Sequence, residues 1–180
     1  SIEQIQPLRD NSDPFNIRKG NPNLKQQFTQ EVGINYNDYK VRTERGIYLS
    51  ANFSTSNNAF TNSDLIDTLG RRVSQYVNVN GNYNYYSYLS YGFKIKKLDL
   101  SVNIDLNSNG SNNNNFVNGQ KNNSKSNTYS AGVNFYYSKE KKFQFSARPN
   151  VSYNMSRSSI NKDLTNKYWS GSMDASFTVY

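Results

Sequence analysis

The chain has 180 residues, a net charge of +8 and a mean hydropathy of −0.89, yet 14% of its residues are aromatic. It contains neither Cys nor His, which excludes disulfides, thiolate metal sites and the usual histidine base of Ser and Cys hydrolases. No apolar run approaches the roughly 18 residues of a transmembrane helix. The many Tyr and Phe residues are not typical of an unstructured polar chain.

Residues 1–27 are expected to form a loop that leads into the first strand, with the tail of a preceding strand near Ile2–Leu8. The pairs Asp13-Pro14 and Asn21-Pro22 cannot lie inside a helix or a central strand, because proline lacks an N–H and restricts the residue before it. The first residues have no basic or apolar signal-peptide region, and we expect the sequence to be a piece of a longer protein.

From residue 28 onward, apolar and polar residues alternate, and this pattern predicts about seven strands. The predicted strands, in chain order, cover residues 28–37, 47–54, 73–95, 98–106, 129–137, 143–155 and 169–179. Short turns are expected near residues 43, 96 and 140, and long polar loops over 57–70, 108–127 and 157–167. Many of the positive charges are clustered at the short turns, which argues against a nucleic-acid interface.

The register of the expected hairpins can be checked against the alternation. A two-residue turn at Lys96-Lys97 pairs Ile95 with Leu98, and the turn near residue 43 pairs Tyr36 with Ala51. Both pairings keep the apolar residues on one face of the sheet and Ser and Asn on the other.

Strands with one apolar and one wet face, joined alternately by short turns and long loops, are typical of an all-β, antiparallel transmembrane β-barrel. Aromatic residues near the strand ends then form interfacial girdles, an interpretation that we favour over stacking of sugars or bases. The residues predicted to face lipid are Val77, Val79, Tyr83, Leu89, Tyr91, Phe93, Leu98, Leu100, Val102, Ile104, Val133, Phe135, Phe143, Phe145 and Phe177.

One motif points to a family. Residues Gly20, Asn21, Pro22, Asn23, Leu24 and Lys25, followed by a polar pair and a strand, resemble the GNPxLKPE signature of TonB-dependent outer-membrane receptors, with Gln26-Gln27 in place of Pro-Glu. The resemblance implies a bacterial outer-membrane location, a barrel of about 22 strands of which this chain supplies about seven, and residues 28–180 as a partial barrel domain. It places the motif at the extracellular end of the first strand.

The same resemblance implies a function: import of a bound ligand such as a siderophore, vitamin or glycan, with energy from the TonB complex acting on parts of the protein not present here. The ligand would meet the long loops and the polar lumen, and the lipid bilayer would be the other partner. No residue in the loops has a specific role assigned to it.

No catalytic residue, cofactor or metal site is predicted, and we expect the chain not to be an enzyme. Asp99 and Asp105 share the polar face of one predicted strand, but six residues separate them by about 20 Å, too far for paired acid and base catalysis. Two alternatives stay open: a small structural or adhesive outer-membrane barrel with an eighth strand from residues 1–9, and a soluble carbohydrate-binding β-sandwich.

Overall fold

The computed structural model describes residues 9–10, 12–161, 163 and 165–180, and within them eleven strands form one sheet. The strands, in chain order, are β1 Arg9–Asp10, β2 Asn16–Lys19, β3 Phe28–Lys40, β4 Arg45–Asn57, β5 Ala59–Ile66, β6 Arg72–Val79, β7 Asn82–Ile95, β8 Leu100–Val117, β9 Gln120–Lys139, β10 Phe143–Ser158 and β11 Asn166–Val179. No helix in this part of the chain is long and apolar enough to cross a membrane.

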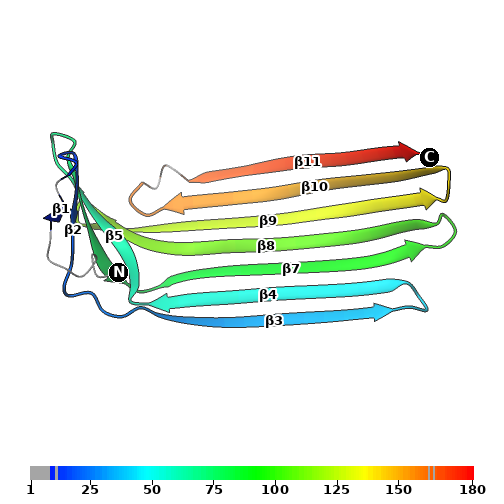
Figure 1. The fold of residues 1–180 in the computed structure, drawn as a ribbon, viewed down its shortest axis with the longest axis horizontal. Coiled ribbons are helices and arrows are strands. Elements are labelled where there is room, and N and C mark those ends of the chain that lie inside the picture. The colour runs from blue at the N-terminus through cyan, green and yellow to red at the C-terminus, as the bar shows by residue number, and fades with distance from the viewer. Residues whose placement is uncertain (1–8, 11, 162, 164) are drawn as a thin grey trace.

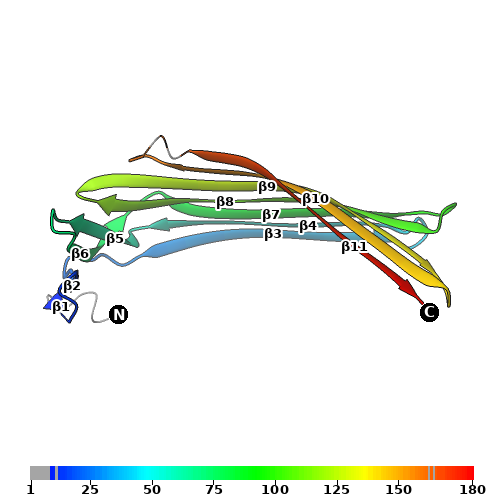
Figure 2. The ribbon, with the colours of Figure 1, turned by 90° about the horizontal axis from the view of Figure 1, so that it is seen from above.

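The long strands lie side by side in the order β3, β4, β7, β8, β9, β10, β11 and form a curved sheet of a single layer (Figures 1 and 2). Each neighbouring pair is antiparallel. The predicted all-β fold is therefore confirmed, and the long strands are antiparallel as predicted. β3 and β11 each pair with only one other strand in the described part of the chain, so this sheet is not closed into a barrel.

The short strands gather at one end of the long sheet, where they form a group that we call the cap: β1, β2, β5, β6 and residues 20–25 (Figure 1). β5 and β6 are an antiparallel hairpin, β2 runs parallel to β6, and the end of β5 pairs with the end of β8. Ile17, Ala59 and Val79 are buried here. The only other buried hydrophobic residues among those described are Val102 and Ala147.

The short turns at the opposite end of the sheet are longer than predicted. Ile95 pairs with Leu100 rather than Leu98, and Tyr36 pairs with Leu49 rather than Ala51. These two turns contain four residues each, and the last residue of each has a positive φ, 51° at Glu44 and 52° at Asp99. A two-residue type I′ turn favours Asn-Gly or Asp-Gly, which neither turn contains. Because the register shifts by two residues, the predicted division of the faces is unchanged.

The single strand predicted over residues 73–95 is wrong. It is two strands, β6 and β7, separated at Asn80-Gly81, where Gly81 has a φ of 88°. Glycine adopts this conformation without the steric strain that a side chain would introduce. The break turns β6 out of the long sheet and into the cap, and it carries Val77 and Val79 with it.

The long flexible loop predicted over residues 108–127 is also wrong. β8 and β9 continue through this segment and meet at a two-residue turn, Asn118-Gly119, with Val117 paired to Gln120. Both turn residues have positive φ, 49° and 74°, as a type I′ turn requires. Composition favoured a loop, but the Asn-Gly pair was the decisive local signal.

Two further segments expected as loops contain strands. Much of the predicted 57–70 loop is β5, and residues 16–19 of the expected entry loop form β2. The predicted 157–167 loop is shorter, since β10 ends at Ser158 and β11 begins at Asn166. The expected strand tail at Ile2–Leu8 lies outside the described residues, as does nearly all of the eighth strand proposed from residues 1–9.

Candidate functional site

The register gives the long sheet two chemically different faces. One row of laterally paired residues illustrates the first face: Ala51, Ser87, Ser108, Tyr129, Tyr153 and Trp169. The next row belongs to the other face and reads Ser50, Tyr88, Asn107, Ser130, Ser152 and Ser170. We call these the apolar face and the polar face. The alternation predicted from the sequence therefore extends laterally across the whole sheet.

Aromatic side chains on the apolar face form two levels. Phe53 stacks on Tyr83 at 6.0 Å, and Tyr153 lies 4.9 Å from Trp169, near the cap end. Near the short turns, the ring pairs are Tyr91–Phe93, Tyr137–Phe143 and Phe143–Phe177, with centroids 5.5–5.7 Å apart. Between the two levels lie aliphatic residues, among them Leu49, Ala51, Leu89, Leu106, Ala131, Val133 and Val151.

The polar face is covered mainly by small side chains that hydrogen bond across strands. Ser130 and Ser152 are 2.8 Å apart, and Asn52 donates to Glu31 at 2.6 Å. Tyr88 donates its hydroxyl to Asp105 at 2.7 Å. No group of three His, Cys, Asp or Glu that could hold a metal ion is found among the described residues.

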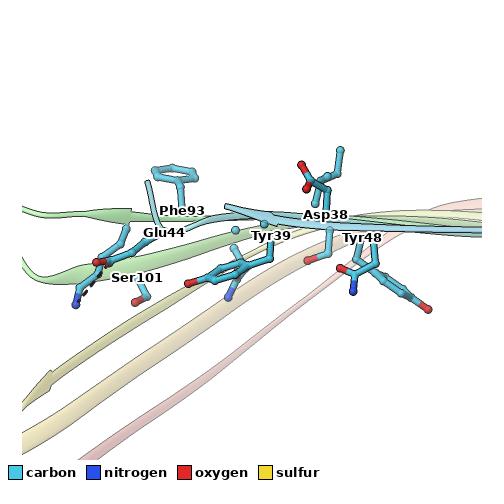
Figure 3. A pocket seen from close by; sticks show the side chains of 13 residues that line it. Asp38, Tyr39, Glu44, Tyr48, Phe93 and Ser101 are labelled. Carbon is cyan, nitrogen blue, oxygen red and sulfur yellow. Dashed lines mark ion pairs between the residues drawn. The ribbon is translucent and has the colours of Figure 1, made fainter. Parts of the chain in front are cut away.

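A shallow hollow of about 420 Å³ lies near the short turns and is lined mainly from the polar face (Figure 3). Gly46 and Gly92 are paired neighbours at its floor. The Tyr39 ring covers Gly46 so closely that a Cβ there would lie 3.1 Å from the ring, and the Asn103 amide occupies the space over Gly92. Figure 3 shows Tyr39 and Tyr48 on one side of the sheet and Phe93 on the other.

Ion pairs lie at the turn side of the hollow. Lys94 Nζ is 4.0 Å from Glu44 Oε2 and also pairs with Asp99, so it links the β3–β4 turn to the β7–β8 turn. The hollow therefore offers hydrogen-bonding groups and a neutralised cation. It holds no pair of free carboxylates suited to acid and base catalysis.

The cap holds the Gly20–Lys25 motif by hydrogen bonds to its backbone. Asn78 of β6 bonds Lys25 twice, because its amide oxygen accepts from the Lys25 N–H at 2.7 Å and its amide nitrogen donates to the Lys25 carbonyl at 2.9 Å. Gln75 donates to the Gly20 carbonyl at 3.0 Å, and the Asn21 side chain donates to a β6 carbonyl at 2.9 Å. The motif thus fastens the entry of β3 to the β5–β6 hairpin.

Asp64 is a buried carboxylate in the cap, with a relative exposure of 8%. It accepts hydrogen bonds from Arg72 and Ser74. Burial alone would raise the pKa of Asp64, but these bonds and the Arg72 charge outweigh it and hold the pKa below its usual value. The backbone of the same residue accepts from the Asn118 N–H at 2.7 Å, which joins the cap to the β8–β9 turn.

Buried asparagines replace a hydrophobic core where the cap meets β8. Asn112 and Asn114 are 6% and 4% exposed. Their amide groups donate to the carbonyls of Gly81 and Asn80, at the break between β6 and β7. Asn123 of β9 donates to both asparagines, at 2.7 and 2.9 Å. This network provides hydrogen-bond donors for the Asn80 and Gly81 carbonyls at the break. The sequence analysis missed it because it treated residues 108–127 as a loop.

Residues 1–179 match the sequence model of the outer membrane protein beta-barrel family. The chain belongs to this family. No curated protein and no solved structure matches the chain. Membership places this outer membrane beta-barrel protein in the bacterial outer membrane, as the sequence predicted. The match confirms that the chain is an outer-membrane barrel protein. It does not identify the chain as a TonB-dependent receptor.

The dimensions of the apolar face of this outer membrane beta-barrel protein suit a bilayer. Leu100 and Gly110 mark its two limits on β8, about ten residues apart. At roughly 3.3 Å per residue and a tilt of about 40°, this span is about 25 Å high, which is the height of the apolar band of outer-membrane barrels. In outer-membrane barrels the short turns face the periplasm, so we expect the short turns of this sheet to face the periplasm and the cap to face outward.

Twelve of the fifteen residues predicted to face lipid lie on the apolar face of the long strands: Tyr83, Leu89, Tyr91, Phe93, Leu100, Val102, Ile104, Val133, Phe135, Phe143, Phe145 and Phe177. Leu98 lies in the β7–β8 turn, and Val77 and Val79 belong to the cap, where Val79 is 5% exposed. Contact with lipid stays a prediction for the set.

Proposed function

We propose that this chain is part of the barrel wall of an import receptor, which takes a bound ligand such as a siderophore, vitamin or glycan across the outer membrane. The observation that carries the proposal is the polar face, which is built mainly of Ser and Asn on an unclosed sheet of seven long strands. The proposal includes no catalytic step.

The size of the polar side chains bears on the size of the barrel. In a barrel of about eight strands, interior side chains fill the lumen, which requires bulky residues. Most side chains of the polar face are small, such as Ser50, Ser130 and Ser152, and larger ones such as Tyr48 and Tyr88 stand between them. A face on which most side chains are small favours a wide lumen, which in the largest barrels is filled by water or by a plug.

The similarity of Gly20–Lys25 to the signature of TonB-dependent receptors favours a plugged receptor over an open pore. Hydrogen bonds to Gln75 and Asn78 give Gly20–Lys25 a structural role at the outer mouth of the wall. The energy for import would come from the TonB complex acting on parts of the protein outside this segment. The ligand would meet the cap, the β8–β9 hairpin and the polar face, where Tyr48 and Tyr88 offer rings 6.0 Å apart.

The alternatives have less support. A small structural barrel would need large side chains to fill its interior, and a soluble sandwich would need a second sheet over the apolar face. Among the described residues, no such second sheet is present.

The test is conductance of the full-length protein that contains this chain, inserted into a planar lipid bilayer. An import receptor with a plug conducts almost no current in plain buffer, and conductance rises when mild denaturant loosens the plug. Uptake of its ligand in cells would stop when an uncoupler collapses the proton gradient. A steady, high conductance from the start would contradict the proposal and identify a passive pore.

A further inference from the structure

Three cations lie together on the apolar face, just past its aromatic level at the cap end. Arg157 of β10 is the direct cross-strand partner of Lys125 of β9. Lys167 of β11 is paired with Met155, which places it one diagonal step from Arg157. Directly opposed residues have Cβ atoms about 5 Å apart, and diagonal neighbours lie about 7–8 Å apart. We call Lys125, Arg157 and Lys167 the outer cation cluster.

No ion pair to a carboxylate is found for this cluster in the described part of the chain. The ion pairs found there involve Arg71, Arg72 and Lys94, and none of the three cluster residues. The neighbouring positions on the same face carry Asn112, Asn127 and Met155. Like charges directly opposite each other destabilise a sheet, so this arrangement costs stability unless an anion lies between them.

The position of the cluster along the membrane normal indicates which kind of anion it would meet. Lys167 is two residues from Trp169, and Arg157 is four residues from Tyr153, both of which belong to the outer aromatic level. At about 3.3 Å per residue with the strand tilt, the charged groups extend about 5–10 Å beyond the rings. Aromatic rings occupy the level of the interface, so the cluster lies among lipid headgroups rather than in the bilayer core.

We propose that the outer cation cluster binds the phosphate groups of an anionic lipid in the outer leaflet. Arg157 supplies a planar fork that matches phosphate oxygens, and the two lysines act as flexible point charges on either side. The proposal depends on the outer-membrane location and on the outward direction of the cap. It does not depend on import.

A second set of cations on the same face provides an internal control. Lys40 and Arg45 are also paired directly, and Lys139 lies on the same face near the short turns. Here Asp38 shares the face, next to the pair. The two sets therefore have the same charge and lie on the same face. Asp38 lies on that face beside the turn-side pair, whereas the carboxylate nearest in sequence to the outer set, Asp163, belongs to the loop between β10 and β11 and forms no ion pair with the set.

The experiment uses the full-length protein that contains this chain, delipidated in a nonionic detergent. Binding of diphosphoryl lipid A, and of the same lipid after chemical removal of its phosphates, is measured by native mass spectrometry and by titration. Two triple variants are compared: Lys125→Gln, Arg157→Gln, Lys167→Gln in the outer cluster, and Lys40→Gln, Arg45→Gln, Lys139→Gln near the turns.

The outer triple variant is expected to lose about 100-fold in affinity, because each interfacial cation contributes roughly fivefold. The turn-side variant should stay within about threefold of the parent protein, and the dephosphorylated lipid should bind the parent no better than it binds the outer variant. An equal loss in both triples would show unspecific attraction and overturn the assignment. Inorganic phosphate that competes as tightly as the lipid would also overturn it and point to a free-anion site.

Folding is checked separately, by the shift in gel mobility on heating that folded outer-membrane barrels undergo. If the outer triple variant does not fold, the single variants Lys167→Gln and Lys167→Arg take its place, with a roughly fivefold loss expected for the first and parent-like binding for the second. Equal binding by these two variants would contradict the proposal. Ligand uptake and bilayer conductance report on import and are independent of this result.

Discussion

The spanning part of the long sheet and the cap are stabilised in different ways. In the spanning part almost no described side chain is buried. Its strands are held together by antiparallel backbone hydrogen bonds, and its two faces meet different environments. The cap has a small buried cluster, an ion pair and amide side chains that bond backbone groups. A sheet whose core is supplied by the bilayer needs no core of its own, whereas a cap in water does.

The largest effect is expected from a charge placed in the middle of the apolar face. Leu89→Arg should destabilise the membrane-inserted protein by about 2–4 kcal/mol, because an arginine near the midplane loses its hydration. Ser90→Arg, one residue along β7 on the polar face, should change stability by less than about 1 kcal/mol. The measurement is urea unfolding in lipid vesicles. Equal losses in the two variants would mean that the faces do not differ.

In the cap, Asp64→Asn should cost about 1–3 kcal/mol, since it removes the charge that Arg72 and Ser74 stabilise. Hydrogen exchange of β5 and β6 should accelerate, while exchange in β10 stays unchanged. Asp174→Asn, on the exposed polar face, is the matched control and should leave the cap protected. Protection of β6 that survives in the Asp64 variant would contradict the account.

The same carboxylate makes the stability of the cap depend on pH. Against the effect of burial, the hydrogen bonds and the charge of Arg72 hold the folded pKa of Asp64 below the ordinary value of an aspartate, about 3.9, so its contribution to stability is fully present above that ordinary value and is lost as pH falls through the lower folded pKa. The protection of β6, measured as its exchange rate relative to the intrinsic amide rate at each pH, should therefore fall on acidification below about pH 4, and more steeply than the protection of β10. In the Asp64→Asn variant, the protection of β6 should depend on pH no more steeply than the protection of β10.

A smaller effect is expected at the motif. Asn78→Ala removes both bonds to the backbone of Lys25 and should cost about 1–2 kcal/mol, concentrated in the segment that enters β3. Limited trypsin digestion should then cleave after Lys25 faster than in the parent protein. Asn84→Ala, in β7, should leave the cleavage rate unchanged, and a faster rate in both variants would point to general loosening.

The smallest effect is expected at the β8–β9 turn. Gly119→Ala places a side chain at a φ of 74° and should cost about 1 kcal/mol. Gly33→Ala meets only ordinary contacts, the nearest at 3.6 Å, and serves as the control. Thermal unfolding of the cap end reports the difference. A turn that tolerates alanine without loss would mean that Asn118-Gly119 does not set this hairpin.

The two regions also differ in how much of them the sequence predicts. Period-2 alternation is a property of single residues and their neighbours, so it identified the two faces of the spanning strands even where the turn lengths were two residues short. The cap depends on contacts between distant segments. Asn78 reaches Lys25 and Asn112 reaches Gly81, and no local pattern encodes these contacts. The sequence analysis therefore interpreted Asn-rich strands as loops and joined β6 to β7, although Asn118-Gly119 and Asn80-Gly81 were local signals it could have used.

The most direct test of the central claim, that one face contacts lipid and the other contacts water, uses spin labels on β7. The chain contains no cysteine, so single cysteines at positions 87–92 each provide one label site in it. In the full-length protein in lipid nanodiscs, labels at positions 87, 89 and 91 should collide mainly with oxygen, which concentrates in lipid. Labels at 88, 90 and 92 should collide mainly with a water-soluble nickel complex. Collision rates that do not alternate along β7, or that alternate in the opposite sense, would contradict the account.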